Sequence, residues 1–254
     1  MSRFFWFTTR LVWLVVRIVA LATSIYVFVL RPWERSWLAT AEEAAKALPG
    51  DDLVPEAAVS ETRAITIEAP PAKIWPWLVQ MGFGRAGWYS YDRMDMRGAS
   101  ADTINPDWQH LEVGELIRTH PEGGFKIADL EPERSLVLYM DTETIGAPRT
   151  HGEGAVAEET PAGLKMAGAI GSMTFAEFKG TWAFYLDPID ERQTRLIERF
   201  RLTMPDQPAS RIAGPALGFG VFLMTRKQML GIKSRAEREA AAGPKPAVRA
   251  PMPA

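Results

Sequence analysis

The chain has 254 residues, of which 47% are hydrophobic and 24% are charged, and its formal net charge is −2. These are ordinary values for a globular protein, and they provide no basic surface for holding nucleic acid. Because the chain has no cysteine, it cannot form a disulfide, a thiolate nucleophile or a Cys-ligated zinc site, and its three histidines lack the spacing of a helical metal pair. We therefore expect no metal, no cofactor and no nucleic-acid partner.

The first predicted element is an apolar helix near the N-terminus. Residues 11–30 are almost unbroken apolar sequence, and twenty residues of helix match a hydrocarbon core of about 30 Å. Arg17 costs about 3 kcal/mol in the bilayer, which the Leu, Ile, Val and Phe residues of the segment outweigh with about −4 to −8 kcal/mol. We predict a membrane anchor over residues 1–37. A signal peptide cleaved near Ala22 is the alternative, but the apolar run continues past that position.

Charged residues flank the predicted span on both sides. Arg3 and Arg10 precede it, and Arg31, Arg35 and Lys46 follow it. Because basic residues mark the cytoplasmic side, this distribution is close to a tie. We expect a single-pass membrane protein whose domain side is undetermined, with a preference for the cytoplasm.

The next segments divide the rest of the chain. Residues 38–58 begin with an Ala/Glu-rich stretch and continue into a sequence broken by three turn residues, which predicts a linker. We assign residues 59–239 to one folded domain. The Pro/Ala-rich residues 240–254 form a predicted disordered tail.

Alternating apolar and polar residues predict an antiparallel sheet. A strand pattern begins near Thr62, and the following helix starts at Pro71, where the missing N–H is not needed. Further strands are predicted at 116–120, 125–130, 135–141, 174–186 and 194–204.

The last two strands each have one apolar face. Phe178, Trp182 and Phe184 share a face of the first, and Leu196 and Phe200 share a face of the second, with three arginines (195, 199 and 201) on the opposite side. The same alternation puts Glu198 on the apolar face, where a lone acid is costly. Two interpretations stay open: a local bulge or pairing with an arginine, and a polar group inside a ligand cavity.

A long amphipathic helix is predicted from about Pro215 to Glu239. Phe222 and Met229 belong to an apolar stripe that recurs at three- and four-residue steps. Such a stripe usually packs on a sheet, and methionine also lines adaptable hydrophobic pockets.

Several segments resemble a known superfamily. They are LPGDDLVP (48–55), TRAITIEAPPAKIWPWLVQMG (62–82), GWYSYDRMD (87–95), INPDWQHLEVGELI (104–117), TWAFYLDPID (181–190) and MLGIKSRAE (229–237). Together they are similar to the SRPBCC superfamily, the START-like group that includes polyketide cyclases and lipid-transport proteins, in a membrane-anchored bacterial branch. The resemblance implies an α+β helix-grip fold, in which a curved antiparallel sheet wraps around a long C-terminal helix. It also implies a cavity for a hydrophobic ligand between the two, without implying one reaction.

Candidate ligand contacts concentrate in one short segment. Trp88, Tyr91 and Asp92 lie within five residues, and aromatic rings with polar groups suit a cavity wall that orients an amphipathic ligand. Core packing is the alternative for the two rings, and a helix or turn cap is the alternative for Asp92. Asp92 and Glu198 are the candidate acid/base residues if they share the cavity, because burial raises a carboxyl pKa. The remaining candidates for ligand binding are Trp108, Phe178, Trp182, Phe184, Phe222 and Met229.

These patterns favour a membrane-tethered module that binds or transfers a lipid or another hydrophobic small molecule. A cyclase- or dehydratase-like enzyme using the same cavity is one alternative, and a scaffold whose interior is filled by its own side chains is the other. Residues 142–171 form a long Gly/Ala-rich connection, which predicts an extended hairpin or a lid at the cavity mouth. The sequence predicts no oligomeric state.

Overall fold

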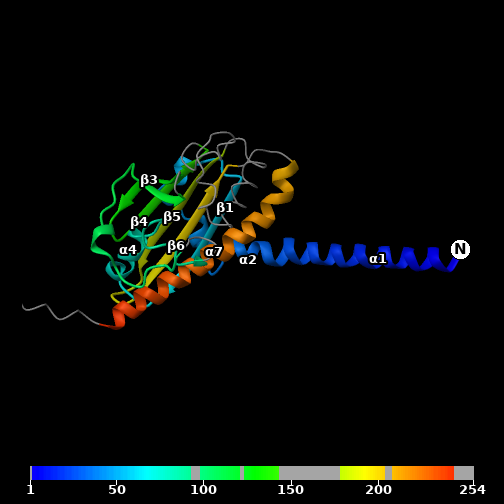
Figure 1. The fold of residues 1–254 in the computed structure, drawn as a ribbon, viewed down its shortest axis with the longest axis horizontal. Helices are drawn as coiled ribbons and strands as arrows, with labels where there is room; N and C mark the ends of the chain where they lie inside the picture. The colour runs from blue at the N-terminus through cyan, green and yellow to red at the C-terminus, as the bar shows by residue number, and fades with distance from the viewer. Residues whose placement is uncertain (1, 93–97, 121–122, 143–177, 204–207, 243–254) are drawn as a thin grey trace, which may run out of the picture.

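The computed structural model describes residues 2–92, 98–120, 123–142, 178–203 and 208–242. The predicted hairpin or lid at 142–171 falls almost entirely outside the described residues, as does the start of the strand predicted from Thr174. Apart from the apolar N-terminal helix, the described elements form one sheet with helices packed on it (Figure 1).

The N-terminal helix is continuous from the second residue to the edge of the domain. It consists of α1 (Ser2–Ile25), a π-helical turn η1 (Tyr26–Leu30) and α2 (Arg31–Arg35). The stretch Arg10–Arg35 contains an 18-residue window with a mean hydropathy of 2.2 and is long and apolar enough to cross a membrane, a property that a signal sequence shares. Its apolar side chains are exposed, and α1 projects away from the domain (Figure 1).

Six antiparallel strands form the sheet in the order β1-β6-β5-β4-β3-β2. Their bounds are β1 (Val59–Ile67), β2 (Leu116–His120), β3 (Gly123–Glu131), β4 (Ser135–Asp141), β5 (Lys179–Pro188) and β6 (Thr194–Leu202). The strands match the predicted positions, and β3 and β4 shift register between Ile127 and Asp129. The predicted antiparallel sheet is confirmed.

Two helices pack on the inner face of the sheet. They are α4 (Pro71–Val79), which begins at the predicted proline, and α7 (Pro208–Ala241), which runs along the sheet (Figure 1). The predicted stripe of α7 is confirmed, because Phe222, Met229 and Ile232 are fully buried. The helix begins seven residues earlier than predicted: Pro208 occupies the first turn, where a proline fits, and Pro215 lies inside the helix.

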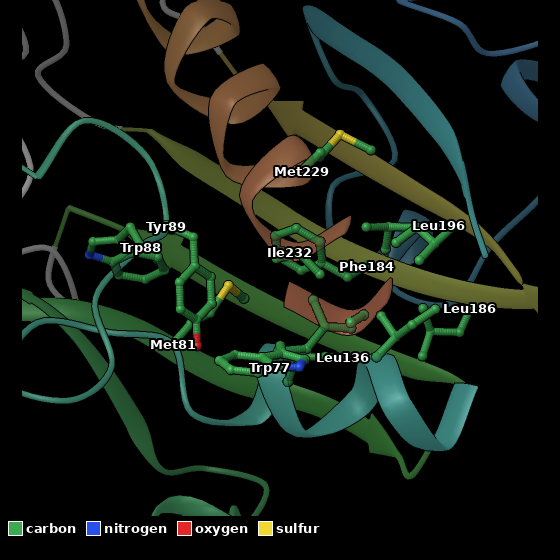
Figure 2. Packing of buried hydrophobic residues seen from close by; sticks show 14 of the residues in the cluster. Trp77, Met81, Trp88, Tyr89, Leu136, Phe184, Leu186, Leu196, Met229 and Ile232 are labelled. Carbon is green, nitrogen blue, oxygen red and sulfur yellow. The ribbon is translucent and has the colours of Figure 1, made fainter. Parts of the chain in front are cut away.

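The core between sheet, α4 and α7 is closely packed where α4 covers the sheet. Trp77 and Met81 of the α4 region meet Leu136 of β4 and Phe184 of β5, with Met229 and Ile232 of α7 above them (Figure 2). The most buried of these side chains have no accessible surface. Burying an aliphatic or aromatic side chain contributes about 1.5–3 kcal/mol, so this cluster supplies much of the stability of the domain.

The outer face of the sheet is covered by the segment predicted as a linker. Short helices α3 (Ala41–Ala45) and η2 (Asp51–Leu53) lie on it, and a capping box between Thr40 and Glu43 starts α3. Ala64, Val137, Ala183, Tyr185 and Ile197 form a second apolar cluster beneath this segment.

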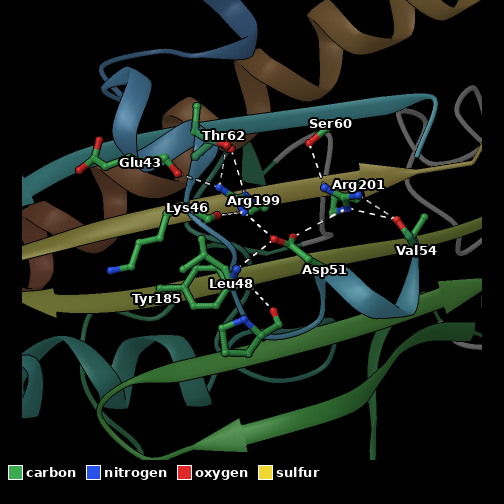
Figure 3. Close-up of polar contacts among 12 residues, drawn as sticks. Glu43, Lys46, Leu48, Asp51, Val54, Ser60, Thr62, Tyr185, Arg199 and Arg201 are labelled. Atoms are coloured by element: carbon green, nitrogen blue, oxygen red, sulfur yellow. Dashed lines mark hydrogen bonds and ion pairs between the residues drawn. The ribbon is translucent and has the colours of Figure 1, made fainter. Parts of the chain in front are cut away.

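The arginines predicted to face outward do so, but a layer of chain covers them. Arg199 donates to the backbone carbonyls of Glu43 and Lys46, each at 2.7 Å, and to the Asp51 carboxylate at 2.7 Å (Figure 3). Arg201 donates to the carbonyl of Val54 at 3.0 Å. Because a guanidinium offers five donors, these side chains satisfy carbonyls that a short irregular segment cannot pair by itself.

Candidate functional site

Three aromatic rings form a continuous surface on the inner face, at the end of the sheet away from α4. Trp88 and Trp182 stack with ring centroids 5.6 Å apart, and Phe125 meets them edge-on at 6.1 and 5.3 Å. We call these three rings the aromatic wall. The Trp182 and Phe125 rings are only partly buried, in contrast to the core beside α4. The wall therefore presents apolar area that the described residues do not cover completely.

A buried ion cluster lies behind the aromatic wall. Arg63 and Glu198 face each other across β1 and β6, and their side chains are 0% and 1% exposed. The Arg63 Nη1 atom donates to Glu198 Oε2 at 3.1 Å, its Nη2 atom donates to Glu61, and its Nε atom donates to the Glu34 carbonyl at 2.9 Å. Both carboxylates are thus held by one guanidinium, which leaves the group of three with an excess negative charge.

The ion cluster and the aromatic wall are joined by one hydrogen bond. The Trp182 indole Nε1 atom donates to Glu198 Oε1 at 2.9 Å. Burial raises the pKa of Glu198 above its ordinary value, and Arg63 opposes that shift. The Glu198 carboxyl group is therefore easier to protonate than one in water.

The structure gives Glu198 an arginine partner. The register of β1, β6 and β5 is regular at this residue, so the strand does not bulge there. Glu198 pairs with Arg63, and a role toward a ligand stays a prediction.

The predicted ligand residues fall into two groups. Trp88, Trp182 and Glu198 are brought together at the wall and the ion cluster. Phe222 lies beside the same cluster, with the Arg63 guanidinium 5.5 Å from its ring centroid. Phe184 and Met229 are fully buried in the core beside α4 (Figure 2), and the Phe184 ring centroid lies 5.1 Å from that of Trp182.

The other predicted residues lie elsewhere. Asp92 accepts a hydrogen bond from the Ser100 hydroxyl at 2.5 Å, and the same hydroxyl accepts from the Tyr89 N–H at 3.0 Å. Tyr91 is 43% exposed, and Trp108 ends the short helix η3 (Pro106–Trp108). Phe178 immediately precedes β5 and donates its N–H to Thr142. No contact between described residues joins Asp92 to Glu198.

Sequence reasoning missed Arg63, Glu61 and Phe125. A signal was present for each, because Arg63 and Glu61 have the same parity as Ile65 in β1. Phe125 likewise has the parity of the buried Ile127 in β3. Extending the alternation argument to every strand would have placed all three on the inner face.

Among the described residues no three His, Asp or Glu side chains gather as a metal site. The carboxylate oxygens of the ion cluster accept hydrogen bonds from Arg63 and Trp182, so the chemistry available there is hydrogen bonding and proton exchange at Glu198.

An antiparallel sheet closed by a long C-terminal helix and preceded by an apolar helix defines this chain as a helix-grip protein. No protein-family model matches the chain, and no curated protein matches it.

Solved structures with similar arrangements come from several bacteria. A conserved protein from Geobacillus kaustophilus is 14% identical, with a TM-score of 0.39 over 71% of this chain and 97% of its own. A hypothetical protein from Helicobacter pylori is 10% identical, with a TM-score of 0.42 over 78% and 99% of the two chains. An aromatase/cyclase from a Streptomyces species is 12% identical, with a TM-score of 0.31 over 74% and 99%. At these values the similarities carry no statement about activity.

Proposed function

We propose that this protein binds a hydrophobic or amphipathic small molecule against the aromatic wall, and that the N-terminal helix holds it at a membrane. The observation that carries the proposal is the partial exposure of Trp182 and Phe125, next to a core beside α4 that is fully buried. Rings of this kind stabilise an apolar ligand by area and by stacking. Glu198 is fully buried and accepts from the Trp182 indole N–H, so it holds a ring of the wall in place and does not contact the ligand directly. The sequence resemblance to the SRPBCC superfamily supports the same function.

Membrane tethering follows from the physics of poorly soluble ligands. The most hydrophobic stretch of the N-terminal helix is 0% buried, which supports its placement in an apolar environment such as a bilayer. A ligand that dissolves mainly in the bilayer reaches a tethered site at a higher effective concentration. Binding or transfer of a membrane-derived molecule is therefore the role that the two parts of the chain support together.

Catalysis has weaker support. The acid/base hypothesis required Asp92 and Glu198 to share a cavity, and their hydrogen bonds lead to Ser100 and to Arg63 with Trp182, respectively. One observation favours a catalytic role, namely the raised pKa of Glu198. Loss of turnover, with ligand binding retained, in a Glu198→Gln variant would establish such a role.

The binding experiment uses the full chain in detergent and a pyrene-labelled fatty acid, with energy transfer from tryptophan as the readout. Trp182→Leu removes one ring of the wall, and we expect affinity to fall about tenfold. Trp75→Leu is the matched control, because Trp75 is a partly buried indole of α4 that lies outside the wall. Equal affinities in the wild type and the Trp182→Leu variant would refute binding at the wall.

The tether is tested separately by alkaline carbonate extraction and by the intact mass of the protein isolated from membranes. A full-length mass in the membrane fraction supports an anchor. A mass that begins after Ala22 identifies a signal peptide and refutes it.

A further inference from the structure

A hollow lies where the apolar helix meets the domain. Its volume is about 420 Å³, and it is lined on one side by Val27, Arg31 and Arg35 of the helix and on the other by Ser60 and Thr62 of β1. This volume is within the range of about 300–1,000 Å³ that is typical of small-molecule sites. We call it the junction hollow.

The helix side of the junction hollow changes from apolar to basic along one helical face. Val27, Arg31 and Arg35 are spaced four residues apart, so their side chains follow one another along the same side of the helix. Val27 belongs to the apolar run that ends at Leu30, and the two arginines come directly after it. In a helix that crosses a bilayer, this is the depth at which hydrocarbon gives way to lipid headgroups.

The charge of the junction hollow is not balanced by its own lining. The described residues that line it include two arginines and no acidic residue. Arg35 donates to the Ser60 carbonyl at 3.2 Å and lies 4.0 Å from Glu61, which is already bound by Arg63. Within the described part of the chain the Arg31 side chain makes no hydrogen bond or close ion pair, although its charge opposes the rise in the pKa of the buried Glu34 carboxyl. Donors of this kind suit a phosphate group, because guanidinium and phosphate geometries match.

We infer that the junction hollow binds the phosphate of an anionic phospholipid, with Arg31 and Arg35 on the phosphate and Val27 beside the upper part of an acyl chain. This inference rests on the proposed membrane tether. It goes beyond that function because it names a second ligand site, outside the aromatic wall, and the class of lipid that occupies it. A bound headgroup would fix the depth of the helix and the position of the domain above the membrane.

The test places the full chain in nanodiscs with equal amounts of phosphatidylglycerol and phosphatidylcholine, and counts retained lipids by native mass spectrometry. We expect the wild type to retain phosphatidylglycerol selectively and Arg31→Gln to retain about fivefold less. Arg31→Lys keeps the charge and should restore most of the retention. Arg226→Gln is the matched control, because Arg226 lies over the Trp37 ring near the junction but does not line the hollow.

Three results would overturn the inference. They are equal retention of the two lipids by the wild type, retention by Arg31→Gln equal to that of the wild type, and binding of inorganic phosphate to the detergent-solubilised chain as tight as that of short-chain phosphatidylglycerol. The last result would assign the hollow to a free anion. Carbonate extraction of the same samples separates the two proposals, since a chain that stays in the membrane without lipid selectivity refutes only the headgroup site.

Discussion

Removing the Arg63 guanidinium should destabilise the protein strongly. In an Arg63→Met variant Glu198 keeps only its hydrogen bond from Trp182, and Glu61 keeps only Arg35 at 4.0 Å. Leaving a buried ion without its partner costs about 3–5 kcal/mol. For a chain of this size about 2–4 °C is lost per kcal/mol, so the unfolding temperature should fall by about 6–20 °C.

The assay is thermal unfolding of the full chain in detergent, followed by tryptophan fluorescence and circular dichroism. Adding Glu198→Gln to Arg63→Met should recover more than half of the loss, because the neutral amide still accepts from Trp182. Arg226→Met makes the same change at an exposed arginine over a ring and should cost about 1 kcal/mol or less. If the Arg63→Met variant has the unfolding temperature of the wild type, an unpaired carboxylate does not destabilise the protein. The same conclusion follows if adding Glu198→Gln lowers the unfolding temperature further.

Three further predictions concern the pH response, the outer face and the packing of α7. The pKa of Glu198 is raised above 4.5 in the folded protein, so its stabilising contribution is complete below about pH 4.5 and is lost as pH rises through the folded pKa. Unfolding temperatures measured from pH 4.5 upward should therefore fall for the wild type relative to Glu198→Gln, and parallel curves would contradict the assignment. Arg199→Leu removes a guanidinium that donates to three backbone carbonyls and one carboxylate of the covering segment. Each hydrogen bond to a charged group contributes about 1.5–3 kcal/mol, so the attachment of this segment to the sheet should weaken. Limited proteolysis should cut residues 39–54 faster, and an unchanged digestion rate would show that the arginine does not hold them. Gly231→Ala places a Cβ 2.4 Å from the Tyr89 carbonyl oxygen and should cost about 1–3 kcal/mol. In contrast, Gly220→Ala meets nothing within 4 Å and should stabilise α7 by about 0.5–1 kcal/mol, as the unfolding temperatures of the two variants would show.

Periodicity in the sequence was enough to predict the sheet and the long helix. Each of these patterns lies within a single strand or helix: the alternation within β5 and within β6, and the apolar stripe through Phe222 and Met229 of α7. Each is confirmed. Burial of a continuous face leaves no other register open, because a shift of one residue would turn every apolar side chain outward.

The covering of the outer face could not be predicted in the same way. Three arginines with outward parity are expected in solvent, and only tertiary contacts show that Arg199 binds the chain before β1. That segment has no periodic pattern of apolar residues. Its backbone carbonyls at Glu43 and Lys46 accept hydrogen bonds from a side chain of β6. The partner of Glu198 could not be predicted for a similar reason. The alternation in β6 predicts which face of the sheet Glu198 occupies, but its partner Arg63 is 135 residues away in the sequence.

The Arg63 guanidinium also connects the N-terminal helix with the aromatic wall. Its Nε atom donates to the Glu34 carbonyl near the end of α2, while its two Nη atoms hold Glu198 and Glu61. Trp33 adds a ring contact with Phe222, at 4.9 Å between centroids. Glu198 in turn accepts from Trp182, so two hydrogen bonds connect Arg63 with the wall. A shift of the helix end would therefore move the Arg63 guanidinium and change the position of Glu198 beside Trp182. The end of the apolar helix and the Trp182 ring of the aromatic wall are therefore both connected to the same buried side chain.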